Sequence, residues 1–115
     1  MRYTVSILVE NKSGVLARIS ALFAARGFNI TSLSVSETED TTISRITIVV
    51  KGNKLILEQI TKRLNKLVDV IEVNDFSSVG YYIERELALI KINAVNKTLR
   101  DEIIRLAGIF KAKII

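Results

Sequence analysis

The sequence predicts an α+β fold of the double split βαβ type, in which an antiparallel sheet carries its helices on one face. Apolar and polar residues alternate from Tyr3 to Glu10, as in a strand with one buried face. A helical stripe follows, and the later patterns complete the order strand, helix, strand, strand, helix, strand. The apolar stripe of the first helix consists of Val15, Leu16, Ile19, Leu22 and Phe23.

The first helix is predicted to lie between two local signals. Ser13 is a candidate N-cap, because its hydroxyl oxygen can accept a hydrogen bond from a backbone N–H of the first turn. Gly27 is a candidate stop, because glycine readily takes the left-handed conformation found at helix ends. Two strands are predicted next, over Ile30–Glu37 and Ile43–Lys51, on either side of the polar turn at 39–41.

The second helix and the last strand complete this unit. Asn53 can cap the helix, and the last strand is predicted over Val68–Asp75. With right-handed crossovers, this order gives a ferredoxin-like βαββαβ fold, a four-stranded antiparallel sheet with two helices on one face. The other face is left uncovered, so we expect a second copy to cover an edge or a face. The apolar stripe of the second helix consists of Ile56, Leu57, Ile60, Leu64 and Leu67.

The patterns divide the chain into a complete unit and an incomplete one. Residues 1–76 form the first unit, residues 77–83 a linker, and residues 84–115 the start of a second similar domain. This partial domain cannot bury a full core alone, so the chain is expected to be a truncated two-domain protein. Its predicted elements are a strand, a helix and the opening of a further strand, over Glu84–Val95, Lys97–Ala107 and Lys111–Ile115.

Composition excludes several classes of function. The 115 residues contain no cysteine and no histidine, which removes disulfides, thiolate chemistry, the commonest general base and the commonest metal ligand. The net charge of +5 comes from scattered Lys and Arg, most simply a solubilising surface. No apolar run approaches the ~20 residues of a membrane span, and no signal peptide is visible, so a cytoplasmic protein with no membrane contact is expected.

The loop before the first helix is the candidate ligand site. Backbone N–H groups at a helix start lack partners and carry the positive end of the dipole, so they can hold a carboxylate. The side-chain amides of Asn11 and Asn29 could orient the ligand and accept from its ammonium. We expect the loop and the start of the second strand to lie close together. Alternatively, Asn11, Gly14 and Asn29 only shape turns. Nothing in this region resembles a reacting group, so the pattern indicates a sensor.

Other functions found on this fold need residues or motifs that can be sought in the sequence. An RNA-recognition domain needs aromatic stacking platforms, but Ile43–Lys51 contains no aromatic residue. A metal carrier would need a cysteine pair, and the chain has none. A small hydrolase of this fold is harder to exclude, because an Arg and an Asn can suffice for phosphoryl chemistry, but no glycine-rich phosphate loop supports it. The acidic cluster of Glu37, Glu39 and Asp40 is more simply an exposed turn, and Arg45 a solvated or interface residue.

Four segments resemble the small regulatory subunit of acetohydroxyacid (acetolactate) synthase. The first two alone would indicate only an ACT domain, a general amino-acid-sensing module, whereas the later two are specific to the small subunit. The resemblance runs along the whole chain in the same order, although family members continue through a complete second domain. The segments are Glu10–Leu16, Arg26–Ile30, Ser44–Ile48 and Leu57–Val70.

The resemblance implies a function and a site. It implies that valine, or another branched-chain amino acid, binds at the interface of a homodimer. It also implies activation and feedback inhibition of a separate large catalytic subunit, which alone would carry thiamine diphosphate, Mg and FAD. No cofactor, metal or nucleic acid is expected on this chain. One methylene discriminates by only ~1–3 kcal/mol, so the sequence cannot separate valine from leucine or isoleucine. The alternatives are an ACT sensor of another pathway or, less favoured, an RNA-binding domain. The ligand-binding residues implied are Asn11, Lys12, Ser13, Gly14, Val15, Leu16, Asn29 and Ile30.

Overall fold

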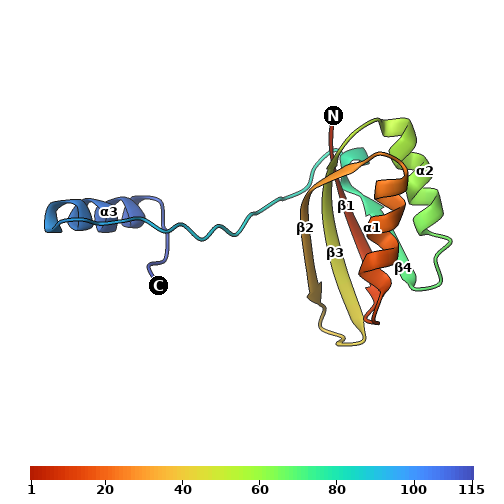
Figure 1. The fold of residues 1–115 in the computed structure, drawn as a ribbon, viewed down its shortest axis with the longest axis horizontal. Coiled ribbons are helices and arrows are strands. Elements are labelled where there is room, and N and C mark those ends of the chain that lie inside the picture. Colours follow the sequence, from red (N-terminus) through yellow and green to blue (C-terminus); the bar gives the residue numbers. More distant parts are fainter. The chain divides into compact units, whose positions relative to one another are not determined.

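The computed structural model describes residues 1–115 and divides them into two units, Met1–Ile83 and Glu84–Ile115 (Figure 1). The elements of the first unit are β1 (Arg2–Glu10), α1 (Val15–Ala25), β2 (Asn29–Glu37), β3 (Ile43–Lys51), α2 (Lys54–Leu64), β4 (Val70–Asp75) and the short 3-10 helix η1 (Phe76–Ser78). The second unit contains α3 (Lys97–Ile109).

The first unit is a four-stranded sheet with both of its helices on one face. The strand order is β2-β3-β1-β4, and every neighbouring pair is antiparallel. The central strands β1 and β3 pair along their whole length, from Arg2 opposite Lys51 to Glu10 opposite Ile43. Figure 1 shows α1 and α2 against the same side of the sheet. The predicted ferredoxin-like βαββαβ fold is therefore confirmed.

The core lies between this face of the sheet and the two helices. The alternation along β1 and β3 places every second side chain there, and the helical stripes supply the other layer. Burying one large aliphatic or aromatic side chain contributes ~1.5–3 kcal/mol, so these contacts supply the main driving force for folding. The most deeply buried side chains are Val5, Ile7, Ile19, Phe23, Ile46, Ile48, Val50, Leu57, Ile60 and Leu64.

The starts of α1 and β4 differ from the prediction. Gly14, not Ser13, is the N-cap of α1, and no side chain caps this helix. The backbone turns into the helix through Gly14 at φ +84°, a left-handed conformation that glycine adopts most readily. β4 begins at Val70 rather than Val68, because a turn closed by the Val70 N–H and the Leu67 carbonyl precedes it. Asn53 caps α2 as predicted, accepting from the Leu55 N–H.

In the second unit only the helix is as predicted. α3 forms, and the Asn96 side chain caps it by accepting from the Leu99 N–H. The strands predicted over Glu84–Val95 and Lys111–Ile115 are wrong, since neither segment pairs with a neighbour. A strand exists only through hydrogen bonds to another strand, so an alternating sequence alone is insufficient. None of the helices in the chain is both long and apolar enough to cross a membrane.

Candidate functional site

The loop of residues 11–14 carries the chain from β1 into α1. Because Gly14 has no side chain to cap the helix, the N-terminal end of α1 has no side-chain acceptor for its first backbone N–H groups. The first turn also contains no acidic residue that would offset the positive end of the helix dipole. The first turn of α1 can therefore accept a small anion such as a carboxylate.

Asn11 joins this loop to the turn between β2 and β3. Its Nδ2 donates to the carbonyl oxygen of Thr41 at 3.0 Å and to Oε1 of Glu37 at 3.2 Å. Its backbone N–H donates to the carbonyl oxygen of Thr42 at 2.8 Å. The side-chain oxygen of Asn11 accepts none of these bonds, so it remains able to accept from a ligand ammonium.

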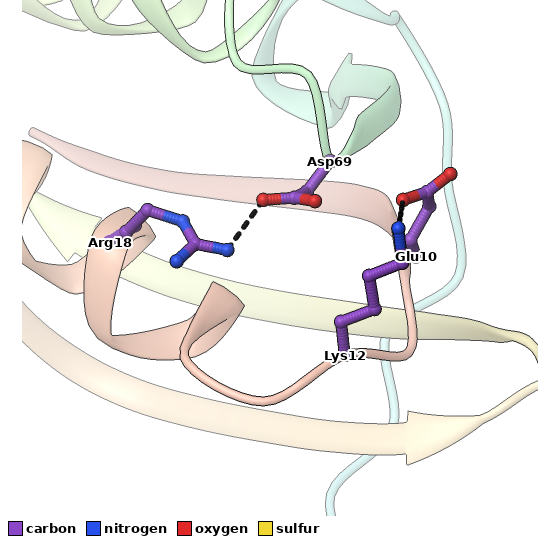
Figure 2. A network of polar contacts seen from close by, with 4 residues as sticks. All are labelled: Glu10, Lys12, Arg18 and Asp69. Atoms are coloured by element: carbon purple, nitrogen blue, oxygen red, sulfur yellow. Dashed lines mark hydrogen bonds and ion pairs between the residues drawn. The ribbon is translucent and has the colours of Figure 1, made fainter.

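Two ion pairs flank the loop (Figure 2). Lys12 Nζ lies 2.7 Å from Glu10 Oε2, and the hydrogen bond and negative charge of Glu10 raise the pKa of this exposed lysine. Arg18 Nη2 lies 2.6 Å from Asp69 Oδ2, which joins the first turns of α1 to the turn before β4. Sequence reasoning missed Arg18 and Asp69. The only signal was a lone carboxylate between two valines at 68 and 70.

The other predicted site residues lie at the start of β2. Asn29 is exposed and Ile30 is half-buried. Both line an open hollow of about 360 Å³ against the outer flank of α1. The remaining lining residues are Ser20, Ala21, Ala24 and Phe28, so the wall formed by the helix consists of small side chains.

The structure does not bring Asn11 and Asn29 together, so the predicted proximity within one chain is wrong. Asn29 pairs with Lys51 at one end of β3, whereas Glu10, which precedes Asn11, pairs with Ile43 at the other end. At about 3.3 Å per residue these positions are roughly 25 Å apart. The reason is the direction of α1, which begins next to the loop and ends next to the start of β2 (Figure 1).

The remaining predicted residues divide between core and surface. Val15 is 3% exposed and belongs to the core, while Leu16 is 39% exposed on the flank of α1. On the outermost strand β2, Leu33 and Val35 are 42% and 44% exposed. Both pair with core residues of β3 and so face the helix side of the sheet, yet they stay open to solvent. The flank of α1 and β2 is thus an apolar surface beside a free strand edge.

No group of three or more His, Cys, Asp or Glu side chains lies where it could hold a metal ion. The groups around the loop offer hydrogen bonding and charge: helix N–H donors, an amide oxygen, and the ion pairs of Figure 2.

Both parts of the chain match models of one protein family. Residues 5–72 match the AHAS small subunit-like ACT domain, and residues 85–115 match a model described as the small subunit of acetolactate synthase. The probable acetolactate synthase small subunit of Archaeoglobus fulgidus is 48% identical over 100% of this chain and 70% of its own length. The isozyme 3 small subunit of Escherichia coli is also 48% identical, over 100% of this chain and 69% of its own length. The acetolactate synthase small subunit of Mycobacterium avium is 51% identical, over 98% of this chain and 66% of its own length.

Solved structures give the same result. The crystal structure of the acetolactate synthase small subunit from Thermotoga maritima is 34% identical with a TM-score of 0.75, covering 100% of this chain and 71% of that one. The ACT domain from GTP pyrophosphokinase of Chlorobium tepidum, at 18% identity and a TM-score of 0.57, covers 75% of this chain and 97% of its own, and shares the fold. These matches confirm the resemblance found in the sequence: the chain belongs to the family of acetolactate synthase small subunits.

Proposed function

We propose that this chain is a regulatory subunit that binds a branched-chain amino acid, with valine the expected ligand, between two copies of its first unit. In this proposal the chain activates the large catalytic subunit of acetolactate synthase and confers feedback inhibition on it. The observation that carries the proposal is the separation of the two predicted halves of the site, which lie at opposite ends of α1 beside an uncovered apolar flank.

A two-fold axis beside β2 would reunite the two halves of the site. Two copies related in this way would pair β2 with β2 and α1 with α1, each in antiparallel orientation. The loop of one copy would then lie next to the start of β2 of the other. The same arrangement would cover Leu16, Leu33 and Val35, which are otherwise exposed, and would remove the free edge of the sheet.

The chemistry of the two halves suits an amino acid. In the proposed site, the N-terminal N–H groups of α1 hold the carboxylate, and the side-chain oxygen of Asn11 accepts from the ammonium. Asn29 and Ile30 of the second copy close the site over the ligand. The aliphatic side chain would lie among apolar residues such as Leu16 and Ile30, which favour valine, leucine or isoleucine over polar amino acids.

Regulation follows if the ligand favours one arrangement of the assembly. A ligand held by two copies stabilises their pairing, and a typical coupling free energy of ~1–3 kcal/mol changes activity several-fold or more. In this proposal the reaction takes place on the large subunit, which would hold the thiamine diphosphate, Mg and FAD that the family implies. The small chain supplies the sensor, works without a cofactor of its own, and contacts neither nucleic acid nor a membrane.

A mixing experiment tests whether the site is shared between copies. Asn11→Ala and Asn29→Ala chains are each expected to lose valine binding in isothermal titration. A heterodimer of the two contains one site with both substitutions and one with neither. Mixing the two variants after dissociation and reassociation should therefore restore binding at about half of the heterodimer's sites. No recovery on mixing, with both variants folded and dimeric, would contradict a shared site.

Two further measurements test the rest of the proposal. Leu33→Asp and Val35→Asp place charges on the apolar flank, so light scattering should show monomers that no longer bind valine. Ser36→Asp on the same strand, at an exposed polar position, is the control. The chain alone should form no acetolactate, and with the large subunit it should raise the rate of synthesis and make it sensitive to valine. Synthesis by the chain alone, or no effect on the large subunit, would contradict the regulatory role.

A further inference from the structure

Asp69 contacts both ends of the loop that precedes α1. Its backbone carbonyl accepts from the N–H of Glu10, the last residue of β1, at 2.8 Å. Its carboxylate accepts from Arg18 Nη2, in the second turn of α1, at 2.6 Å. Figure 2 shows Asp69 between these two partners. One residue of the α2–β4 turn thus contacts Glu10, just before the loop, and Arg18, in the helix that follows the loop.

Stability alone is a weak explanation for this pair. The Asp69 side chain is 13% exposed but that of Arg18 is 51% exposed, and an ion pair with this much solvent contact typically contributes only ~0–1 kcal/mol. A cation near the N-terminal end of a helix is also unfavourable, because it lies at the positive end of the dipole. The arrangement is better explained by what Arg18 and Asp69 hold in place.

Arg18 holds the turn at Gly14. Its backbone N–H donates to the Gly14 carbonyl at 3.1 Å, and its Nη1 would lie 3.2 Å from a Cβ atom at position 14. The guanidinium therefore lies against the left-handed turn that aims the first N–H groups of α1. Asp69 accepts from the other terminal nitrogen, Nη2, so the position of this guanidinium depends on a residue that is remote in sequence.

We propose that Asp69 is a positioning residue for the amino-acid site, acting through Arg18 on one end of the loop and through Glu10 on the other. The proposal rests on the proposed function of the loop as a carboxylate site. By linkage, a ligand that orders the loop must also order the α2–β4 turn, because the same contacts join them. The α2–β4 turn is then the first part of the fold, outside the site, to respond to the ligand.

Hydrogen exchange and titration with valine, on the full chain, test the proposal. Asp69→Asn and Arg18→Gln should each raise exchange at residues 12–17 but not at the centre of β3, and each should lower valine affinity about tenfold. The double variant should lose no more than the worse single variant, because the two residues act as one unit. Arg105→Gln, which removes the comparable ion pair with Glu102 on α3, is the matched control and should change neither. Valine should slow exchange at residues 66–70 in the unsubstituted chain and not in Asp69→Asn.

The outcomes separate this proposal from the function on which it rests. If the unsubstituted chain binds no branched-chain amino acid, the proposed function fails, while the exchange of the free loop still measures whether Asp69 holds it. If valine binds with equal affinity to the Asp69→Asn variant, the positioning role is overturned. Faster exchange spread over the whole sheet, with affinity falling only in proportion to the folded fraction, would overturn it as well.

Discussion

Gly52 is expected to be intolerant of even one extra methyl group, because Phe28 occupies the space beside it. A Cβ atom at position 52 would lie 2.7 Å from Cζ and 2.8 Å from Cδ1 of the Phe28 ring, with Cε1 nearer still. Phe28 is 6% exposed and packs edge-on against Phe23, with ring centroids 6.4 Å apart. The ring cannot move aside without disturbing the core.

The expected cost follows from two opposing effects. Gly→Ala at a position without a positive φ normally stabilises by ~0.4–1 kcal/mol, because it restricts the unfolded chain. Gly52 itself is exposed, but a methyl group forced against a packed side chain such as Phe28 costs ~1–3 kcal/mol. Gly52→Ala should therefore lower the free energy of unfolding by about 1–2 kcal/mol net. In a Phe28→Val background, which removes the clashing ring atoms, the same substitution should be neutral or stabilising.

Urea denaturation followed by circular dichroism measures this double-mutant cycle. Gly80→Ala is the matched control, since nothing lies within 4 Å of a Cβ atom there, and it should not destabilise. The Gly52–Phe28 coupling should be ~1–2 kcal/mol, within the range for residues in contact. If Gly52→Ala costs the same in both backgrounds, or raises stability on its own, the steric reasoning is refuted.

Three more predictions concern caps, turns and pH. Asn53→Ala should cost ~1 kcal/mol in urea denaturation, because α2 loses its side-chain cap, whereas Asn96→Ala should lower only the helical signal of α3. Gly14 has φ +84°, so Gly14→Ala should destabilise the protein by ~1–2 kcal/mol. Gly14→Asn should cost less, because asparagine tolerates the left-handed conformation. Equal costs for the two variants in thermal unfolding would exclude backbone strain as the cause. The side-chain and backbone hydrogen bonds of Thr42 hold the pKa of Asp40 below its ordinary value. The contribution of this carboxylate to stability is therefore complete above its unfolded pKa, and it is lost as the pH falls through the lowered folded pKa. Nuclear magnetic resonance titration should show the pKa of Asp40 rising in the Thr42→Val variant.

The fold was predictable because each element of the first unit carries a pattern with one period. In the strand from Tyr3 to Glu10 every second residue is apolar, with Leu8 the one apolar residue on the other face, and the helices carry stripes at helical spacing, so local preference and burial agree. The segment 84–95 is also rich in apolar residues, at 87, 89, 90 and 92, yet forms no strand, because no strand of the structure pairs with it. Alternating apolar residues specify which face of a strand is apolar, but they do not supply a second strand to pair with it.

The candidate site was predictable in composition but not in geometry. The residue types at positions 11–14 predict a helix start that could hold an anion, and the structure places there a helix start without a side-chain cap. That Gly14 rather than Ser13 occupies the N-cap depends on a backbone angle that no residue type determines alone. The separation of Asn11 from Asn29 depends on the direction of a whole helix, and the contact between Arg18 and Asp69 joins residues 51 positions apart in sequence.

The missing cap of α1 has a consequence for the lifetime of the protein. Both α2 and α3 begin with an asparagine whose side chain accepts from a backbone N–H, whereas α1 begins with Gly14 and forgoes roughly a few tenths of a kcal/mol. A bound carboxylate would supply that stabilisation from outside, so resistance to heat and to proteases would rise with the concentration of the ligand. When the amino acid is scarce, the unliganded form would open more often and be degraded sooner. In the proposed function, the abundance of the protein would then follow the supply of its ligand.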